Sequence, residues 1–334
     1  MRSFGNAADG KRSGAELIAA SPATRALLGE AGRIARFDVP VLIEGETGSG
    51  KELLARYVHD RSPRRGRPLV AVNCGALPDG LLEAEFFGHA RGAFTGADAA
   101  RPGLLEAADG GTLFLDEVGE LSPHGQALLL RALQEREFRR VGEIRVRRSD
   151  FRLIAATHRP LAELAAAEAF RRDLFYRLGV VRLRLPPLRE RRAEIPELAA
   201  ALVTRLARRY GLPSPRLSED ALEVLARRDW PGNVRELESA LTSAILKRPR
   251  APVIGPEMLE EMPPRGDAGP GSPPPDPVLA ALEIRRLAAA RTAFERLVLL
   301  RALRHAAGSR VRAARDLGIS RQSLWQKLRR HGIA

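Results

Sequence analysis

The chain has 334 residues, 44% of them hydrophobic, which is enough for roughly two or three domains with buried cores and excludes a largely disordered protein. Cys74 is the only cysteine, which excludes a disulfide within the chain and favours a reducing compartment, so we expect the protein in the cytoplasm. The net charge of +14 by itself excludes little, because arginine enrichment can follow from a GC-rich genome as well as from a polyanionic partner.

Residues 1–15 predict a loose tail without the apolar stretch of a secretory signal, and no later segment approaches the about 18 apolar residues of a membrane span. From residue 16 to 185, apolar runs alternate with helical patterns. Four runs read as strands, namely 39–46, 68–74, 111–118 and 150–157. Continuous apolar runs are typical of strands covered on both faces, so this part predicts an α/β layer with a parallel sheet and flanking helices.

The pattern changes at "PPLRER" (186–191). Beyond it, helical periodicity covers 194–211, 218–228 and 234–247, with the turn "DWPGN" before the last of these helices. The sequence therefore predicts a small all-helical subdomain, which we place at 186–261.

A Pro/Gly/Ser-rich stretch follows and predicts a linker over 262–280. The last segment, 281–334, is helical in pattern and strongly basic. It holds thirteen Arg and Lys residues against three acidic ones, so it carries +10 of the chain's net charge of +14. This density favours binding to nucleic acid.

The segment "GETGSGKE" (45–52) stands between an expected strand and an expected helix, and fits the phosphate-binding pattern G-x-x-x-x-G-K in its required context. Backbone N–H groups of such a loop and the helix N-terminus attract phosphates, and Lys51 would reach the β- and γ-phosphates. A glycine-rich turn without a ligand is the alternative. The predicted nucleotide-binding residues here are Gly45, Glu46, Thr47, Gly48, Ser49, Gly50, Lys51 and Glu52. Glu52 departs from the Ser or Thr that usually ligates Mg²⁺.

A second half of such a site is predicted by "GGTLFLDE", in which four apolar residues lead to Asp116 and Glu117. The carboxyl end of a buried strand is where ligands bind in open α/β sheets. Asp116 is the candidate Mg²⁺ ligand, and Glu117 the candidate base that polarises the attacking water. Together with Lys51, these carboxylates predict ATP hydrolysis.

The segment 310–332 reads as helix, turn and helix. Gly318 suits the left-handed residue that ends the first helix, Ser320 suits the N-cap of the second, and Leu324 and Leu328 would form the buried stripe. The candidate DNA-binding residues are Arg310, Ser320, Arg321, Gln322, Ser323, Gln326 and Lys327. A helical dimerisation module with solvated charges is the alternative.

Taken together, the motifs resemble those of the NtrC-type AAA+ activators of sigma-54 RNA polymerase. In chain order they are "GETGSGKE", "VNCGAL", "EFFGHARGAFTGA", "GGTLFLDEV", "IAATHRPL", "FRRDLFYRL", "LPPLRERRAEI" and "WPGNVREL". They span about residues 20–247, and the intact "GAFTGA" is nearly diagnostic. Glutamate after the loop lysine is typical of this family, and the C-terminal segment resembles its Fis-type helix-turn-helix domain.

The resemblance implies a fold, cofactors and partners. The fold would be an AAA+ P-loop ATPase with a helical lid, followed by an all-α helix-turn-helix domain. ATP and Mg²⁺ would be the cofactors, and a hexameric ring on double-stranded DNA at upstream enhancer sites would act on sigma-54 RNA polymerase. The residues implied to contact sigma-54 are Gly92, Ala93, Phe94, Thr95, Gly96 and Ala97.

The resemblance also implies roles for single residues. Asn73 would hold Glu117 in an inactive pose, and Thr157 occupies the sensor position, followed by His158 where many relatives have Asn. Arg171 and Arg177 match two arginine fingers that reach a neighbouring subunit, although Arg177 could instead form an ordinary salt bridge. Arg235 matches the second sensor, on the lid. Arg172, between the fingers, is given no role.

Three functions remain open at this point. The favoured one is an ATP-hydrolysing activator that binds upstream DNA and opens sigma-54 promoters, with Phe94 at the tip of a loop that grips sigma-54; Phe94 as an ordinary core residue is the alternative. The second is a DNA-binding regulator on the same scaffold that does not engage sigma-54. The third is an AAA+ motor that remodels its target outside transcription.

About twenty residues precede the ATPase domain, too few for a receiver domain. We therefore expect control by an inhibitory regulator protein, by expression level or by assembly.

Overall fold

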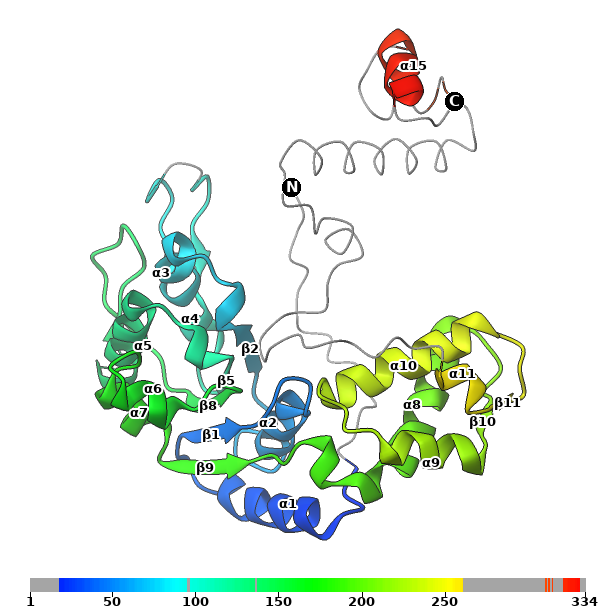
Figure 1. The fold of residues 1–334 in the computed structure, drawn as a ribbon. Helices are drawn as coiled ribbons and strands as arrows, with labels where there is room; N and C mark the ends of the chain where they lie inside the picture. The colour runs from blue at the N-terminus through cyan, green and yellow to red at the C-terminus, as the bar shows by residue number, and fades with distance from the viewer. Residues whose placement is uncertain are drawn as a thin grey trace. The chain divides into compact units, whose positions relative to one another are not determined.

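The structure is a computed structural model that describes residues 18–94, 97–135, 137–260, 310, 312, 314 and 321–330 (Figure 1). The chain divides into two compact units, Met1–Pro263 and Pro264–Ala334. The predicted tail and linker lie outside the described residues, as do Thr95, Gly96 and Ser320 and the side chains of Arg321 and Gln326.

The first unit is built on five parallel strands in the order β2-β5-β8-β1-β9 (Figure 1). Their bounds are β1 Val41–Glu44, β2 Leu69–Asn73, β5 Thr112–Asp116, β8 Arg152–Thr157 and β9 Val181–Arg184. The four predicted strands are confirmed, and β9 is added at the sheet edge. Every residue of β8 is buried, as continuous apolar runs predict for a central strand.

Helices cover both faces of the sheet, because successive residues of a strand point to opposite sides. On one face, Val41 and Ile43 pack with α1 (Pro22–Ala35) and α2 (Lys51–Asp60). On the other, Leu42 belongs to the core formed with the remaining helices of this layer. These are α3 Asp79–Phe87, α4 Leu104–Ala107, α5 Pro123–Glu135, α6 Leu161–Ala166 and α7 Arg172–Leu178. The carboxyl ends of the strands meet at one edge of this sheet, which is where ligands bind in open α/β sheets.

The helical part of the first unit (Figure 1) has its own core, which includes the buried Trp230. Its elements are α8 Ile195–Tyr210, α9 Glu219–Arg227, α10 Asn233–Lys247 and α11 Glu257–Glu260, with the short strands β10 Arg216–Leu217 and β11 Val253–Ile254. Gly211 ends α8 with φ +65°, and the Ser218 side chain caps α9 by accepting from the Ala221 N–H. The three predicted lid helices are confirmed within a residue or two.

Two hairpins extend the α/β layer beyond the sheet. They pair β3 Gly88–His89 with β4 Arg101–Pro102, and β6 Glu137–Phe138 with β7 Arg147–Arg148. The Ala90 N–H donates to the Val141 carbonyl at 2.9 Å, and the Val141 N–H donates to the Gly88 carbonyl at 2.9 Å. These bonds join the loops of the two hairpins side by side.

In the second unit, α15 covers Arg321–Arg330. Leu324 and Leu328 are buried, as their spacing of four predicts, and Ala314 is buried as well. Gln322 and Arg310 are exposed, whereas Ser323 and Lys327 are half-buried. Among the described residues, no helix is both long enough and apolar enough to cross a membrane.

Candidate active site

The phosphate-binding loop connects β1 to α2. Gly48 and Gly50 have φ of +76° and +107°, so the loop needs glycine at both positions. Lys51 is the first residue of α2. Its ammonium donates to the Gly45 carbonyl at 3.0 Å and to the Glu46 carbonyl at 3.4 Å. The loop therefore stands between a strand and a helix, as the sequence predicts, and its binding of phosphate stays a prediction.

The lid closes directly on this loop. A Cβ at Gly48 would lie 2.5 Å from the Gly232 carbonyl oxygen and 3.0 Å from the Arg235 Cβ. The Val234 N–H, in the first turn of α10, donates to the Gly48 carbonyl at 3.0 Å. Arg235, the predicted second sensor, is exposed in the same turn. The N-terminal end of α10 is therefore held against the phosphate loop.

We expect Gly48→Ala to lower ATP affinity by about tenfold or more, because the methyl group would push the loop and α10 apart and overpacking costs about 1–3 kcal/mol. Titration with a fluorescent ATP analogue measures the effect. Gly110→Ala is the matched control, since Gly110 also has a positive φ, +69°, but nothing lies within 4 Å of its added Cβ. An unchanged affinity in Gly48→Ala would show that the close approach has no role in nucleotide binding.

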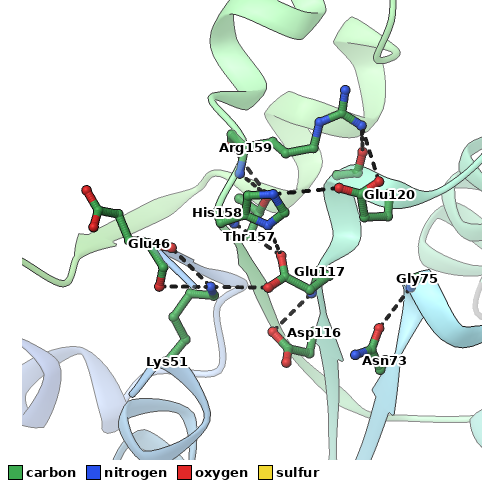
Figure 2. Close-up of polar contacts among 12 residues, drawn as sticks. Glu46, Lys51, Asn73, Gly75, Asp116, Glu117, Glu120, Thr157, His158 and Arg159 are labelled. Atoms are coloured by element: carbon green, nitrogen blue, oxygen red, sulfur yellow. Dashed lines mark hydrogen bonds and ion pairs between the residues drawn. The ribbon is translucent and has the colours of Figure 1, made fainter. Parts of the chain in front are cut away.

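Asp116 and Glu117 stand at the carboxyl end of β5, opposite the loop (Figure 2). The Glu117 Oε1 lies 3.3 Å from the Lys51 Nζ, and the Asp116 Oδ1 accepts from the Glu117 N–H at 3.0 Å. Burial and the neighbouring Glu117 charge raise the pKa of Asp116. Burial alone would raise the pKa of Glu117 too, but the hydrogen bond from His158 and the charge of Lys51 outweigh it and lower that pKa. Glu117 is therefore a carboxylate at neutral pH.

His158, at the end of β8, holds the other oxygen of Glu117. Its Nδ1 lies 2.6 Å and its backbone N 3.2 Å from Glu117 Oε2 (Figure 2). Thr157, one residue earlier, is fully buried, and its hydroxyl accepts from the Arg159 N–H at 3.0 Å.

Asn73 does not make the contact that the resemblance implies. Its Oδ1 accepts from the Gly75 N–H at 2.9 Å, because it caps the short helical turn Cys74–Ala76 after β2. Among the residues that the structure describes, no hydrogen bond joins Asn73 to Glu117. The residues that hold Glu117 are His158 and Lys51, and sequence reasoning gave no such role to His158.

A second group that sequence reasoning missed ties the loop to the lid. Arg189 binds the Glu46 carboxylate through both terminal nitrogens, at 2.6 and 2.8 Å. Asn233 donates to Glu46 Oε2 at 3.1 Å and accepts from the Leu188 N–H at 2.7 Å. The buried Arg191 donates to the Ser49 carbonyl at 2.6 Å. Arg189, Arg191 and Asn233 belong to the motifs "LPPLRER" and "WPGN". The sequence shows their charged and amide groups, but it does not show which distant residues these groups bind.

The two predicted arginine fingers lie at the two ends of α7. Arg171 is 48% exposed and pairs with Asp173 through two bonds of 3.1 and 2.7 Å. Arg177 donates to the Leu133 carbonyl at 3.0 Å and pairs with no carboxylate of a described residue. Neither reaches Lys51 or Glu117 of its own chain, so within one subunit they are not part of the site.

Phe94 stands in the loop between β3 and β4. Its side chain is 39% exposed, and its ring meets the edge of His89 at a centroid distance of 5.0 Å. The loop turns on itself, since the Gly92 N–H donates to the Ala97 carbonyl at 2.8 Å and the Ala97 N–H to the Phe94 carbonyl at 3.0 Å. Phe94 is therefore outside the core clusters and presented at the surface.

The neighbouring hairpin carries an exposed apolar residue that the sequence analysis did not select. Ile144, in the β6–β7 loop, is 89% exposed. Its signal was a single isoleucine within the charged run "GEIRVRR". The two joined loops thus place Phe94 and Ile144 on one projecting part of the layer.

The residues at the end of β5 fit a magnesium ion. Mg²⁺ prefers oxygen ligands and is commonly held by one or two carboxylates together with substrate phosphates. Among the residues that the structure describes, Asp116 Oδ2 accepts no hydrogen bond and the buried Ser49 hydroxyl in the loop has no hydrogen-bond partner. No cluster of three or more metal-ligating side chains occurs in the part of the chain that is described.

Three family models match the chain. They are the Sigma-54 interaction domain over residues 17–184, the AAA+ ATPase lid domain over 189–269, and the bacterial regulatory protein, Fis family, over 290–331. The matched regions cover the nucleotide site, the lid and the basic C-terminal segment.

Known proteins and solved structures are similar over nearly the whole chain. The transcriptional regulatory protein ZraR of Salmonella typhimurium is 46% identical over 314 residues, which cover 94% of this chain and 68% of that protein. The response regulator protein PilR of Pseudomonas aeruginosa is 44% identical over 317 residues, covering 95% and 70%. The crystal structure of NtrX from Brucella abortus in complex with ATP has a TM-score of 0.69 and 31% identity, over 95% of this chain and 69% of that chain. NtrX has also been solved in complex with ADP.

Proposed function

The chain belongs to the sigma-54-dependent transcriptional activators with an AAA+ ATPase, a lid and a Fis-type DNA-binding domain, and we propose here which of its residues perform that activity. The match to the Sigma-54 interaction domain argues against the two alternative functions, a DNA-binding regulator that does not engage sigma-54 and an AAA+ motor that remodels a target outside transcription. The observation that carries the residue assignment is the 3.3 Å contact between Glu117 and Lys51 across the sheet edge.

ATP binds with its phosphates in the loop 45–50, where backbone N–H groups and Lys51 neutralise their charge. Asp116 would hold Mg²⁺, which supplies charge neutralisation at the β- and γ-phosphates. Glu117 accepts the proton of the attacking water, and its low pKa keeps it in the basic form. Thr157 on β8 and Arg235 on the lid are the two residues that we propose as sensors of the nucleotide. The close contact between the loop and α10 supports a lid that responds to the nucleotide.

The site takes its remaining positive charge from a second copy of the chain. Arg171 is exposed and does not reach the Lys51 of its own subunit. This supports a role of Arg171 across the interface between neighbouring subunits of a ring. We propose that the ring has six subunits. Arg177 would assist it. Hydrolysis then moves the Phe94 loop, residues 92–97, against sigma-54, while the basic segment holds the ring on double-stranded upstream DNA. An inhibitory regulator protein would control this assembly.

Arg171→Ala is expected to lower ATP hydrolysis by about 10³-fold or more, the usual worth of an arginine finger, with ATP affinity nearly unchanged. Lys51→Ala is expected to be inactive because it does not bind ATP. Mixing the two inactive proteins should restore part of the activity, since an intact site can then meet an intact finger from its neighbour. Phosphate release measures all three samples.

Arg172→Ala is the matched control, because Arg172 is also exposed and adjacent in sequence, and among the described residues its hydrogen bond goes to the Ala165 carbonyl and not to a carboxylate. It should hydrolyse ATP at the rate of the unchanged protein. If the mixture stays inactive although both proteins assemble, Arg171 does not act across an interface.

A further inference from the structure

The carboxylate of Glu117 is held unequally at its two oxygens. Oε2 lies within hydrogen-bonding distance of two nitrogens of one residue, the His158 backbone N at 3.2 Å and ring Nδ1 at 2.6 Å (Figure 2). Within the described part of the chain, Oε1 has one partner, the Lys51 Nζ at 3.3 Å. Glu117 itself has a left-handed backbone, with φ +53°, which is strained for a residue with a side chain. Contacts from two other elements thus determine where this side chain points.

We assign the donor role in this contact to the His158 ring nitrogen, because the same Glu117 oxygen also accepts from the His158 backbone N–H. An ionised carboxylate only accepts hydrogen bonds, so Nδ1 carries the proton. Hydrogen bonds to an ionised group are shorter and stronger than neutral ones, in agreement with the short Nδ1 to Oε2 distance. The side-chain contact is therefore the stronger of the two that His158 makes.

His158 is itself held in place from its far side. Its Nε2 lies 3.8 Å from Glu120 Oε1, and Arg159 binds the Gly119 carbonyl at 2.8 Å and Glu120 at 3.5 Å. The His158 side chain is only 21% exposed. The segment after β8 is therefore bound to the segment after β5 at several points, and the imidazole has little freedom to leave Glu117.

We propose that His158 is a positioning residue for the catalytic base: it holds Oε2 of Glu117 so that Oε1 faces the phosphate loop and accepts the proton of the attacking water. This inference rests on the proposed role of Glu117. The resemblance gives Asn73 a hold on Glu117 in an inactive pose, whereas in this structure the Asn73 Oδ1 accepts from the Gly75 N–H and His158 holds the carboxylate. His158 therefore acts on the base, not on the nucleotide.

The test uses the position of the donor atom along the side chain. The Nδ2 of asparagine occupies the place of histidine Nδ1, whereas the Nε2 of glutamine occupies the place of histidine Nε2. His158→Asn should therefore keep the bond to Glu117, and His158→Gln and His158→Ala should lose it. We measure kcat and KM for ATP, together with ATP affinity, on the full-length chain.

We expect His158→Ala and His158→Gln to lower kcat by about tenfold, the value of one hydrogen bond to a charged group, with KM and ATP affinity within about twofold. His158→Asn should stay within about threefold of the unchanged kcat. In a Glu117→Gln background, His158→Ala should cause no further loss, because both changes remove the same oriented base. His124→Ala is the control, since His124 is exposed on α5.

Three results would overturn the proposal: full kcat in His158→Ala, rescue by glutamine but not by asparagine, or a rise in KM at constant kcat. The last would place His158 on the nucleotide. If the alanine variant does not fold, the comparison of asparagine with glutamine decides. A Glu117→Gln variant that hydrolyses ATP normally would reject the proposed function itself, which separates that failure from a failure of the His158 assignment.

Discussion

Replacing Glu117 with glutamine is expected to stop ATP hydrolysis while the protein still binds ATP. Glutamine keeps the size of the side chain but its amide cannot accept the proton of water, and a general base contributes about 10²–10⁴-fold to the rate. The pKa of Glu117 lies below its ordinary value of 4.5, so the carboxylate persists at neutral pH and the basic form is lost only in more acidic solution. Phosphate release gives the rate, and a fluorescent ATP analogue gives the affinity.

The matched control for this change is Glu163→Gln, an exposed glutamate on α6 that undergoes the same loss of charge. It should hydrolyse ATP at the unchanged rate. Loss of the ion pair with Lys51 should not weaken ATP binding, because the freed ammonium then pairs with phosphate alone. A Glu117→Gln protein that turns over ATP as fast as Glu163→Gln would remove Glu117 from the mechanism.

Phe94→Ala is expected to abolish promoter opening while ATP hydrolysis stays within about twofold of the unchanged rate. A half-exposed aromatic contributes little to the stability of its own domain, where surface substitutions change stability by about 0.5 kcal/mol or less. Buried by a partner, the same ring becomes an anchor whose removal costs at least about 2 kcal/mol of binding. Open-complex formation with sigma-54 RNA polymerase and phosphate release are measured on the same preparation.

Phe37→Ala provides the matched control, because Phe37 is 63% exposed but follows α1, remote in sequence from the GAFTGA motif. It should leave both activities unchanged. Equal losses of hydrolysis and promoter opening in Phe94→Ala, accompanied by a lower Tm, would mean that Phe94 supports the fold of the loop and does not act as a contact for sigma-54.

Much of the architecture could be predicted from local pattern. Residues 113–115 and 153–156 are wholly apolar because both faces of β5 and β8 are covered, so their strand character is visible without the fold. The strand β9 was less visible, because at the sheet edge its two arginines alternate with apolar residues and stay exposed. The lid helices were placed well because amphipathic periodicity and capping residues are both local signals.

By itself, the sequence determined the chemistry that each segment can perform. Glycines at 48 and 50, Lys51, and the paired acids after β5 are short-range patterns whose backbone and charge requirements hold wherever the segment lies. "GAFTGA" likewise places an aromatic among residues too small to bury it.

Only the tertiary structure decided which of these groups meet. Glu46 lies 143 residues from Arg189, and Glu117 lies 41 residues from His158, so no spacing rule joins them. Asn73 is the last residue of β2 and His158 follows β8, and these two strands flank β5. The local turn at Cys74–Ala76 uses the Asn73 oxygen, while the loop after β8 brings His158 onto the carboxylate. That choice depends on side-chain directions across neighbouring strands, which are set by the packing of the whole sheet.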